Sequence, residues 1–114
     1  MRPVSLDKGE AKIEMTVGER LHNAMGTVHG GILCDLADAA MGTAFAATLG
    51  EGESFTTLDL SARYFQAVRA GHLVAEARVA QRGKSVGFVE ADVTDAEGRT
   101  VARFASTCVV LRRS

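Results

Sequence analysis

Hydrophobic and polar positions follow two different periods along the chain. Residues 11–17 alternate between apolar and polar, which puts the apolar side chains on one face of a strand. Residues 31–49 are instead rich in Ala, Leu and Met at helical spacings, with apolar residues on the other faces too. This stretch predicts one long helix that is buried nearly all round. We expect Gly50 to end it in the left-handed conformation that costs glycine little.

After the helix the pattern is typical of strands, because it alternates with a period of two. In the first of these strands Leu58 and Tyr64 are expected on one face, and Thr57 and Asp59 on the other. In the third strand the apolar phase slips after Phe88, which leaves open a bulge or a sheet covered on both sides. The predicted strands are residues 55–65, 72–82, 85–94 and 100–111, and the last three form an antiparallel meander.

The order of elements predicts an α+β fold in which one long central helix is wrapped by an antiparallel sheet of about five strands. At 114 residues the chain has the size of one small core, so a single domain over 1–114 is expected. One sheet and one helix leave apolar surface uncovered. We therefore expect a homo-oligomer in which the sheets of two chains continue edge to edge. It should be at least a dimer, and we favour a tetramer.

Composition and charge narrow the possible partners. The formal net charge is -1 and the pI is about 6.3, so no global positive field would gather nucleic acid or an anionic membrane. Residues 1–10 lack the apolar stretch of a signal peptide, and two aspartates interrupt the apolar region 30–49. A cytoplasmic protein is expected. Cys34 and Cys108 are too few and too isolated for a disulfide framework or a zinc site, and are interpreted as buried apolar residues.

Polar groups gather where the loop 23–31 enters the helix. If the helix begins near Gly30, its first backbone N–H groups have no intrahelical acceptor and carry the positive end of the dipole. Glycine there would let a carbonyl oxygen approach these groups, so the segment predicts an oxyanion site. Asp38 lies about two turns into the apolar helix, where a carboxylate is costly unless it is paired or functional. Asp35 lies three residues away, and spacing alone does not rank the two.

These motifs resemble those of a known family. The pattern N-x-x-G-x-x-H-G-G over residues 23–31 is followed by an aspartate on the helix, by T-x-D at 57–59 and by G-K-S at 83–85. Together they resemble the hotdog-fold acyl-CoA thioesterases of the phenylacetate-degradation type, over roughly residues 11–111. The resemblance implies a hotdog fold and hydrolysis of acyl-CoA without a metal. It also implies no cofactor, because CoA is part of the substrate.

The resemblance also implies roles for individual residues. The acid on the central helix corresponds by spacing to Asp38 rather than Asp35. Three loop and helix-start positions would orient the nucleophile and polarise the thioester carbonyl, a strand threonine would lie near the acid, and the G-K-S turn would lie against the CoA moiety. The catalytic residues predicted in this way are Asp38, His29, Gly30, Asn23 and Thr57, and the CoA-binding residues are Gly83, Lys84 and Ser85.

The leading hypothesis is hydrolysis of a medium-sized or aromatic acyl-CoA, with Asp38 as general base on water or as nucleophile. One alternative keeps the fold but hydrates or dehydrates an acyl thioester. Another is a non-catalytic acyl-CoA binding module. The turn at Lys84 is not a P-loop, because the G-x-x-x-x-G-K-[ST] spacing is missing. Arg112 and Arg113 are interpreted as a solvated tail that could assist binding of the CoA phosphates.

Overall fold

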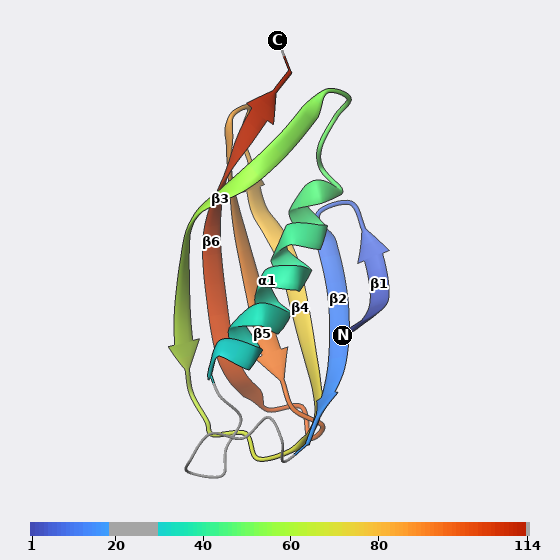
Figure 1. The fold of residues 1–114 in the computed structure, drawn as a ribbon, viewed down its shortest axis with the longest axis vertical. Helices are drawn as coiled ribbons and strands as arrows, with labels where there is room; N and C mark the ends of the chain where they lie inside the picture. The colour runs from blue at the N-terminus through green and yellow to red at the C-terminus, as the bar shows by residue number, and fades with distance from the viewer. Residues whose placement is uncertain (19–29, 114) are drawn as a thin grey trace.

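The computed structural model describes residues 1–18 and 30–113. The strands of these residues form one antiparallel sheet in the order β1-β2-β4-β5-β6-β3, which curves around a single helix (Figure 1). The predicted α+β architecture is confirmed, with six strands where about five were expected. In chain order the elements are β1 Arg2–Asp7, β2 Glu10–Val17, α1 Gly30–Ala46, β3 Glu53–Tyr64, β4 Gly71–Arg82, β5 Val86–Thr94 and β6 Thr100–Arg112.

Strand β1 is absent from the sequence-based prediction. It pairs antiparallel with β2 at the edge of the sheet, and all six of its residues are exposed. Its register shifts between Pro3 and Ser5. A proline is tolerated at such an edge because its missing N–H would face away from the sheet. The strand buries nothing, so the sequence carries no buried apolar face to reveal it.

Helix α1 packs one face against the sheet and leaves the other open in the single chain. Asp35 and Asp38 are exposed on the open face. The prediction of a helix buried nearly all round is therefore wrong for one chain, because only one layer of sheet covers it. No helix in the described ranges is long and apolar enough to cross a membrane. The buried residues of α1 are Leu33, Leu36, Ala37, Ala40, Met41, Ala44 and Phe45.

The end of α1 differs from its predicted form. The helix tightens into a turn in which Thr48 N–H donates to the Phe45 carbonyl at 2.9 Å and Leu49 N–H to the Ala46 carbonyl at 3.1 Å. These i to i+3 bonds satisfy the last carbonyls without a left-handed residue. The prediction of a left-handed Gly50 is wrong: the left-handed glycine is Gly52, with φ of 76°, immediately before β3.

In the third predicted strand, β5, the apolar residues change from even to odd positions after Phe88 because both faces of the strand carry apolar side chains. Odd-numbered residues from Gly87 to Val93 are buried against α1, whereas Val86 and Phe88 are 38% and 49% exposed on the outer face. Pairing with β6 is continuous from Val86 to Val93, so β5 carries no bulge there. The irregularity of this hairpin lies in β4, between Val79 and Gln81. The outer face thus keeps an apolar patch in the single chain.

Candidate active site

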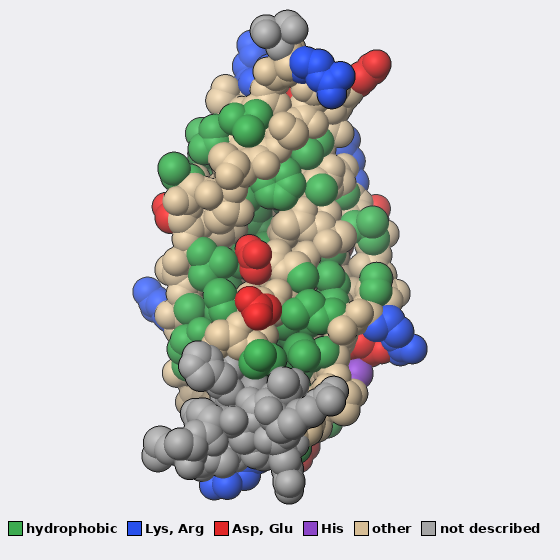
Figure 2. Space-filling view, viewed as in Figure 1, with side chains coloured by type: hydrophobic (Ala, Val, Ile, Leu, Met, Phe, Trp, Pro, Cys, Tyr) green, Lys and Arg blue, Asp and Glu red, His purple; other side chains and the backbone are tan. Residues whose placement is uncertain are grey.

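The two helix aspartates lie on the open face of α1. Figure 2 shows acidic side chains in the middle of this face with hydrophobic side chains around them, and Lys and Arg side chains towards the outline of the molecule. Both Asp35 and Asp38 are exposed, so burial does not rank them. The sequence-based argument from the cost of a buried carboxylate therefore fails in the single chain. The candidate catalytic carboxylate must therefore be chosen by comparing the residues that surround Asp35 and Asp38.

Asp38 is distinguished from Asp35 by lying in a row of α1 that faces β3. Burial raises the pKa of the Cys108 thiol, hydrogen bonds with the Ser106 and Thr57 hydroxyls lower it, and the carboxylates of Asp38 and Asp59 raise it. Along α1, Asp38 lies in the same i, i+4 row as Gly30 and Gly42. A Cβ on Gly30 would lie 3.1 Å from the Tyr64 ring, and one on Gly42 3.9 Å from the Phe55 ring, both on β3. Asp38 is thus the carboxylate on the side of α1 where Thr57 lies. The structure brings these two predicted site residues into one neighbourhood.

A bulge in β3 puts Thr57 on that side. Thr57 pairs with Cys108 and Asp59 pairs with Thr107, which leaves Leu58 as the extra residue. Cys108 is buried on the α1 side, so its partner Thr57 faces α1, while Asp59 faces outward and accepts a bond from the Thr107 N–H at 3.2 Å. The prediction that Thr57 and Asp59 share a face is wrong, because simple alternation does not foresee an inserted residue.

At the start of α1, Gly30 lies against Tyr64 from the end of β3. The Tyr64 hydroxyl donates to the Gly30 carbonyl at 3.0 Å. A Cβ on residue 30 would lie 3.1 Å from Cζ and 3.2 Å from the hydroxyl oxygen of that ring, so glycine permits the close approach. Burial raises the pKa of Tyr64, which keeps the phenol a donor. This corner lines a pocket with Gly30, Leu33, Tyr64, Phe65, Gln66, Ala67 and Val68.

Sequence reasoning did not select Tyr64, although it is the single tyrosine of the chain. It also interpreted Cys34 and Cys108 as buried: Cys108 is 2% exposed, and Cys34 is only half-buried on α1. The predicted site residues Asn23 and His29 lie outside the described residues.

The Gly83–Lys84–Ser85 turn lies at the opposite end of α1 from Gly30. The Arg82 guanidinium before the turn stands 5.4 Å from the centre of the Phe45 ring near the end of the helix. Fifteen residues separate Gly30 from Phe45, or about 22 Å along a helix. Asp38 lies between them, about 12 Å from Gly30 along the axis. One chain therefore does not bring the turn and the helix start together.

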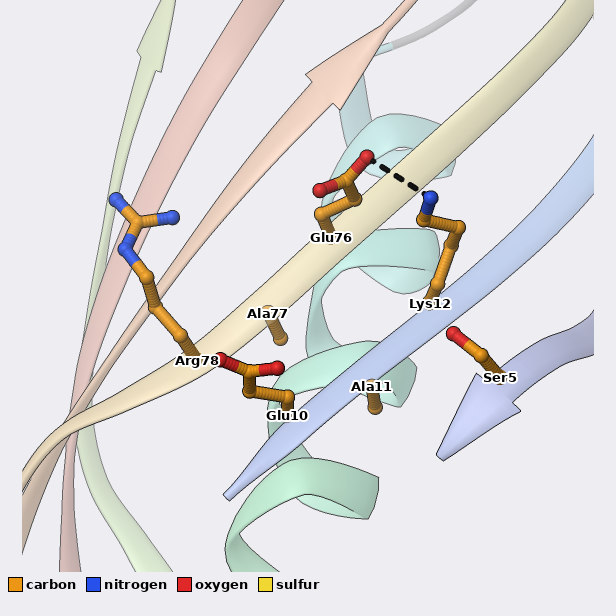
Figure 3. A pocket seen from close by; sticks show the side chains of 7 residues that line it. All are labelled: Ser5, Glu10, Ala11, Lys12, Glu76, Ala77 and Arg78. Carbon is orange, nitrogen blue, oxygen red and sulfur yellow. Dashed lines mark ion pairs between the residues drawn. The ribbon is translucent and has the colours of Figure 1, made fainter. Parts of the chain in front are cut away.

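A hollow on the outer face is not part of this neighbourhood (Figure 3). It lies among β1, β2 and β4, and Lys12 and Glu76 point toward one another across it, with Nζ and Oε1 3.3 Å apart. No residue of α1 lines it. Lys12 and Glu76 already pair with each other in this hollow. The sheet lies between the hollow and the two helix aspartates. The hollow is not a candidate for the site.

Comparison with known proteins agrees with the fold and the motifs. Residues 25–102 match the family model of the thioesterase superfamily, and the chain belongs to this superfamily. It is a thioester hydrolase with the hotdog fold of the phenylacetate-degradation type, as its motifs predicted.

Two relatives and one solved structure illustrate the similarity. The acyl-coenzyme A thioesterase PaaI of Escherichia coli is 34% identical over 89% of this chain and 71% of its own length. The 1,4-dihydroxy-2-naphthoyl-CoA hydrolase of Listeria monocytogenes is 32% identical over 81% of this chain and 75% of its own. A Streptococcus mutans protein bound to acetyl CoA has 26% identity and a TM-score of 0.90, covering 98% of this chain and 89% of that one.

Proposed function

We propose that this protein hydrolyses a medium-sized or aromatic acyl-CoA thioester to the free acid and CoA, with Asp38 as the catalytic carboxylate. The observation that carries the proposal is the position of Asp38: it is exposed on the open face of α1, in the i, i+4 row that faces β3, the strand that bears Thr57. The names of the relatives support the substrate class, since one is an acyl-CoA thioesterase and another acts on an aromatic acyl-CoA.

The chemistry needs a base or nucleophile and a site for negative charge. As general base, Asp38 accepts a proton from water while the water oxygen bonds to the thioester carbon; the C–S bond then breaks and the CoA sulfur takes up the proton. As nucleophile, the same carboxylate attacks the thioester carbon, the C–S bond breaks and CoA leaves as a thiolate, which gives an anhydride. Water then hydrolyses the anhydride to the free acid and the Asp38 carboxylate, and the CoA thiolate takes up the proton that water releases. In both routes the carbonyl oxygen gains negative charge. The backbone N–H groups at the start of α1, at Gly30, would stabilise this charge. No step requires a metal or a cofactor.

Asp38 and Gly30 can act on one carbonyl only if they come from two chains. They lie on the same helix about 12 Å apart, which is too far for both to contact a single thioester group. We therefore propose that Asp38 of one protomer faces Asn23, His29 and Gly30 of its partner, and that Thr57 lies beside the acid. Mixing Asp38→Ala with His29→Ala protein should restore activity; verified mixed dimers without activity would contradict the shared site.

The surface of the single chain supports a homo-oligomer. Strand β3 is twelve residues long at the edge of the sheet, and Leu58 is 67% exposed on it. A long open edge of this kind is a template for pairing with a second chain. The exposed Val86 and Phe88 on the outer face would be covered if two dimers formed a tetramer.

The experiment that tests the function is a free-thiol assay over a panel of acyl-CoAs, including phenylacetyl, hydroxybenzoyl and straight chains of several lengths. We expect thiol release, with the highest kcat/KM on a medium-sized or aromatic acyl group. Addition of water to an enoyl-CoA without thiol release would favour a hydratase. Binding of acyl-CoA without any turnover would favour a non-catalytic binding module, and either result would refute the proposal.

The CoA moiety is proposed to lie against Gly83, Lys84 and Ser85. Lys84 and Ser85 are exposed in the β4–β5 turn, and the Ser85 carbonyl accepts a bond from the Val110 N–H at 2.8 Å, which ties the turn to β6. An exposed ammonium in a turn fixed to the sheet suits a phosphate-bearing ligand.

A further inference from the structure

One carboxylate, Glu53, connects two arginines from different strands. Its Oε1 lies 2.9 Å from Nη2 of Arg82 on β4, and its Oε2 lies 3.0 Å from Nη2 of Arg112 on β6. Oε1 also accepts a bond from the Gly50 N–H at 2.8 Å. The Glu53 side chain is 16% exposed, so this cluster is partly sheltered from water. Glu53 therefore fixes two guanidinium groups relative to each other.

Both arginines also bind the backbone of the β4–β5 turn. Arg82 Nη1 donates to the Gly83 carbonyl, and Arg112 Nη2 donates to the Lys84 carbonyl. Two successive carbonyl oxygens of the turn are thus engaged by cations. A carbonyl oxygen that faced a phosphate would repel it, so engaging these oxygens favours an anion beside the turn.

Further contacts hold Arg82 in place. Its Nε donates to the Thr48 hydroxyl at 3.1 Å, and its guanidinium stands over the Phe45 ring. The Gly50 N–H, with smaller effects from the two arginines, holds the pKa of Glu53 below its usual value, so the carboxylate is charged at neutral pH. The cluster thus links the end of α1, the start of β3 and the turn.

We propose that Glu53 is a positioning residue for the nucleotide end of CoA. By holding Arg82 and Arg112 on the carbonyl oxygens of Gly83 and Lys84, it fixes the turn in the conformation that receives the phosphates. This inference rests on the proposed function, in which the same turn contacts CoA. Glu53 itself does not touch the ligand.

The direction in which Glu53→Gln changes the affinity for CoA distinguishes a positioning role from a simple charge effect. Glu53→Gln removes a negative charge close to the proposed phosphate site, so Coulomb attraction alone predicts tighter CoA binding. Positioning predicts weaker binding, because a neutral amide holds two guanidinium groups poorly. Glu51→Gln is the matched control: it removes the same charge from an exposed residue two positions away in the turn before β3.

The test is calorimetric titration of free CoA into the folded wild-type protein and the two variants. We expect Glu53→Gln to bind CoA about 5- to 20-fold more weakly, and Glu51→Gln to stay within about twofold of wild type. Kinetics should agree: for Glu53→Gln, KM for the best acyl-CoA rises while kcat is kept. The kcat/KM for the same acyl group on N-acetylcysteamine, which carries no phosphate, should not change.

Arg112→Lys provides a second variant in case Glu53→Gln fails to fold. It keeps the charge, but a lysine cannot span Glu53 and the Lys84 carbonyl in the same way, so it should also weaken CoA binding. Binding as tight as wild type in either folded variant would overturn the positioning role. A wild-type protein that neither binds CoA nor releases thiol from any acyl-CoA would refute the proposed function itself, and this inference with it.

Discussion

Gly87→Ala should destabilise the fold through steric overlap with the Phe45 ring. A Cβ on residue 87 would lie 2.2 Å from Cε1 and 2.9 Å from Cζ of Phe45, whereas carbon atoms in contact prefer about 3.5–4.0 Å. The Phe45 ring has little room to move, because it is fully buried and packs edge to face on Phe55 at 5.1 Å between centroids. Either the ring or β5 must shift.

The expected cost follows from the size of this overlap. Overpacking a well-filled core by one methyl group costs about 1–3 kcal/mol. For a domain of roughly 100 residues, each kcal/mol lowers Tm by about 4–8 °C. Thermal unfolding of Gly87→Ala followed by circular dichroism should therefore show a Tm lower by roughly 4–24 °C at equal protein concentration.

The control is Gly50→Ala, where the added Cβ would meet Glu53 Oε1 at 3.5 Å, an ordinary contact. Its Tm should lie within a few degrees of wild type. Combining Gly87→Ala with Phe45→Leu should cost less than the sum of the single changes, because the smaller side chain relieves the overlap. An unchanged Tm in Gly87→Ala, or full additivity in the double variant, would refute the reasoning.

Three further predictions concern the site and the assembly. Tyr64→Phe removes the bond to the Gly30 carbonyl, so Tm should fall by a few degrees, from a loss of about 0.5–1.5 kcal/mol, and kcat should fall too; a variant unchanged in both would contradict the contact. The raised pKa of Cys34 predicts slower alkylation by iodoacetamide at pH 8 in the folded than in the unfolded protein, with faster reaction in Asp38→Asn because one raising charge is gone; equal rates would count against it. Sedimentation at micromolar concentration should show an oligomer, and a monomer would overturn the shared site.

The meander and the helix could be predicted from sequence because their periodicity reports burial directly. Strands β4, β5 and β6 were placed within one residue at each end, since most of their length alternates between buried and more exposed residues. Strand β1 could not be found, because an edge strand that buries nothing leaves no such pattern. The sequence-based prediction overestimated the burial of α1. Its open face is also rich in small apolar residues, and the sequence does not show which layer covers them.

The sequence suggested candidate site residues but not their arrangement. The glycine at the start of α1 and the acid on the helix follow from local chemistry, and the resemblance chose Asp38 over Asp35. The bulge at Leu58, which turns Thr57 toward α1, is a property of pairing between β3 and β6 and has no local sign. The contacts of Glu53 with Arg82 and Arg112 join three strands, so they appear only in the folded chain.

The role of Asp38 is tested most directly by kcat and Tm of Asp38→Asn and Asp35→Asn on the best substrate of the panel. The amide keeps the shape of the side chain and removes its charge and basicity. A catalytic Asp38 predicts a fall in kcat of about 10²- to 10⁴-fold in Asp38→Asn, with Tm within a few degrees of wild type, and a mild effect in Asp35→Asn. Near-wild-type turnover in a folded Asp38→Asn protein would contradict the proposed mechanism and the assignment of the site.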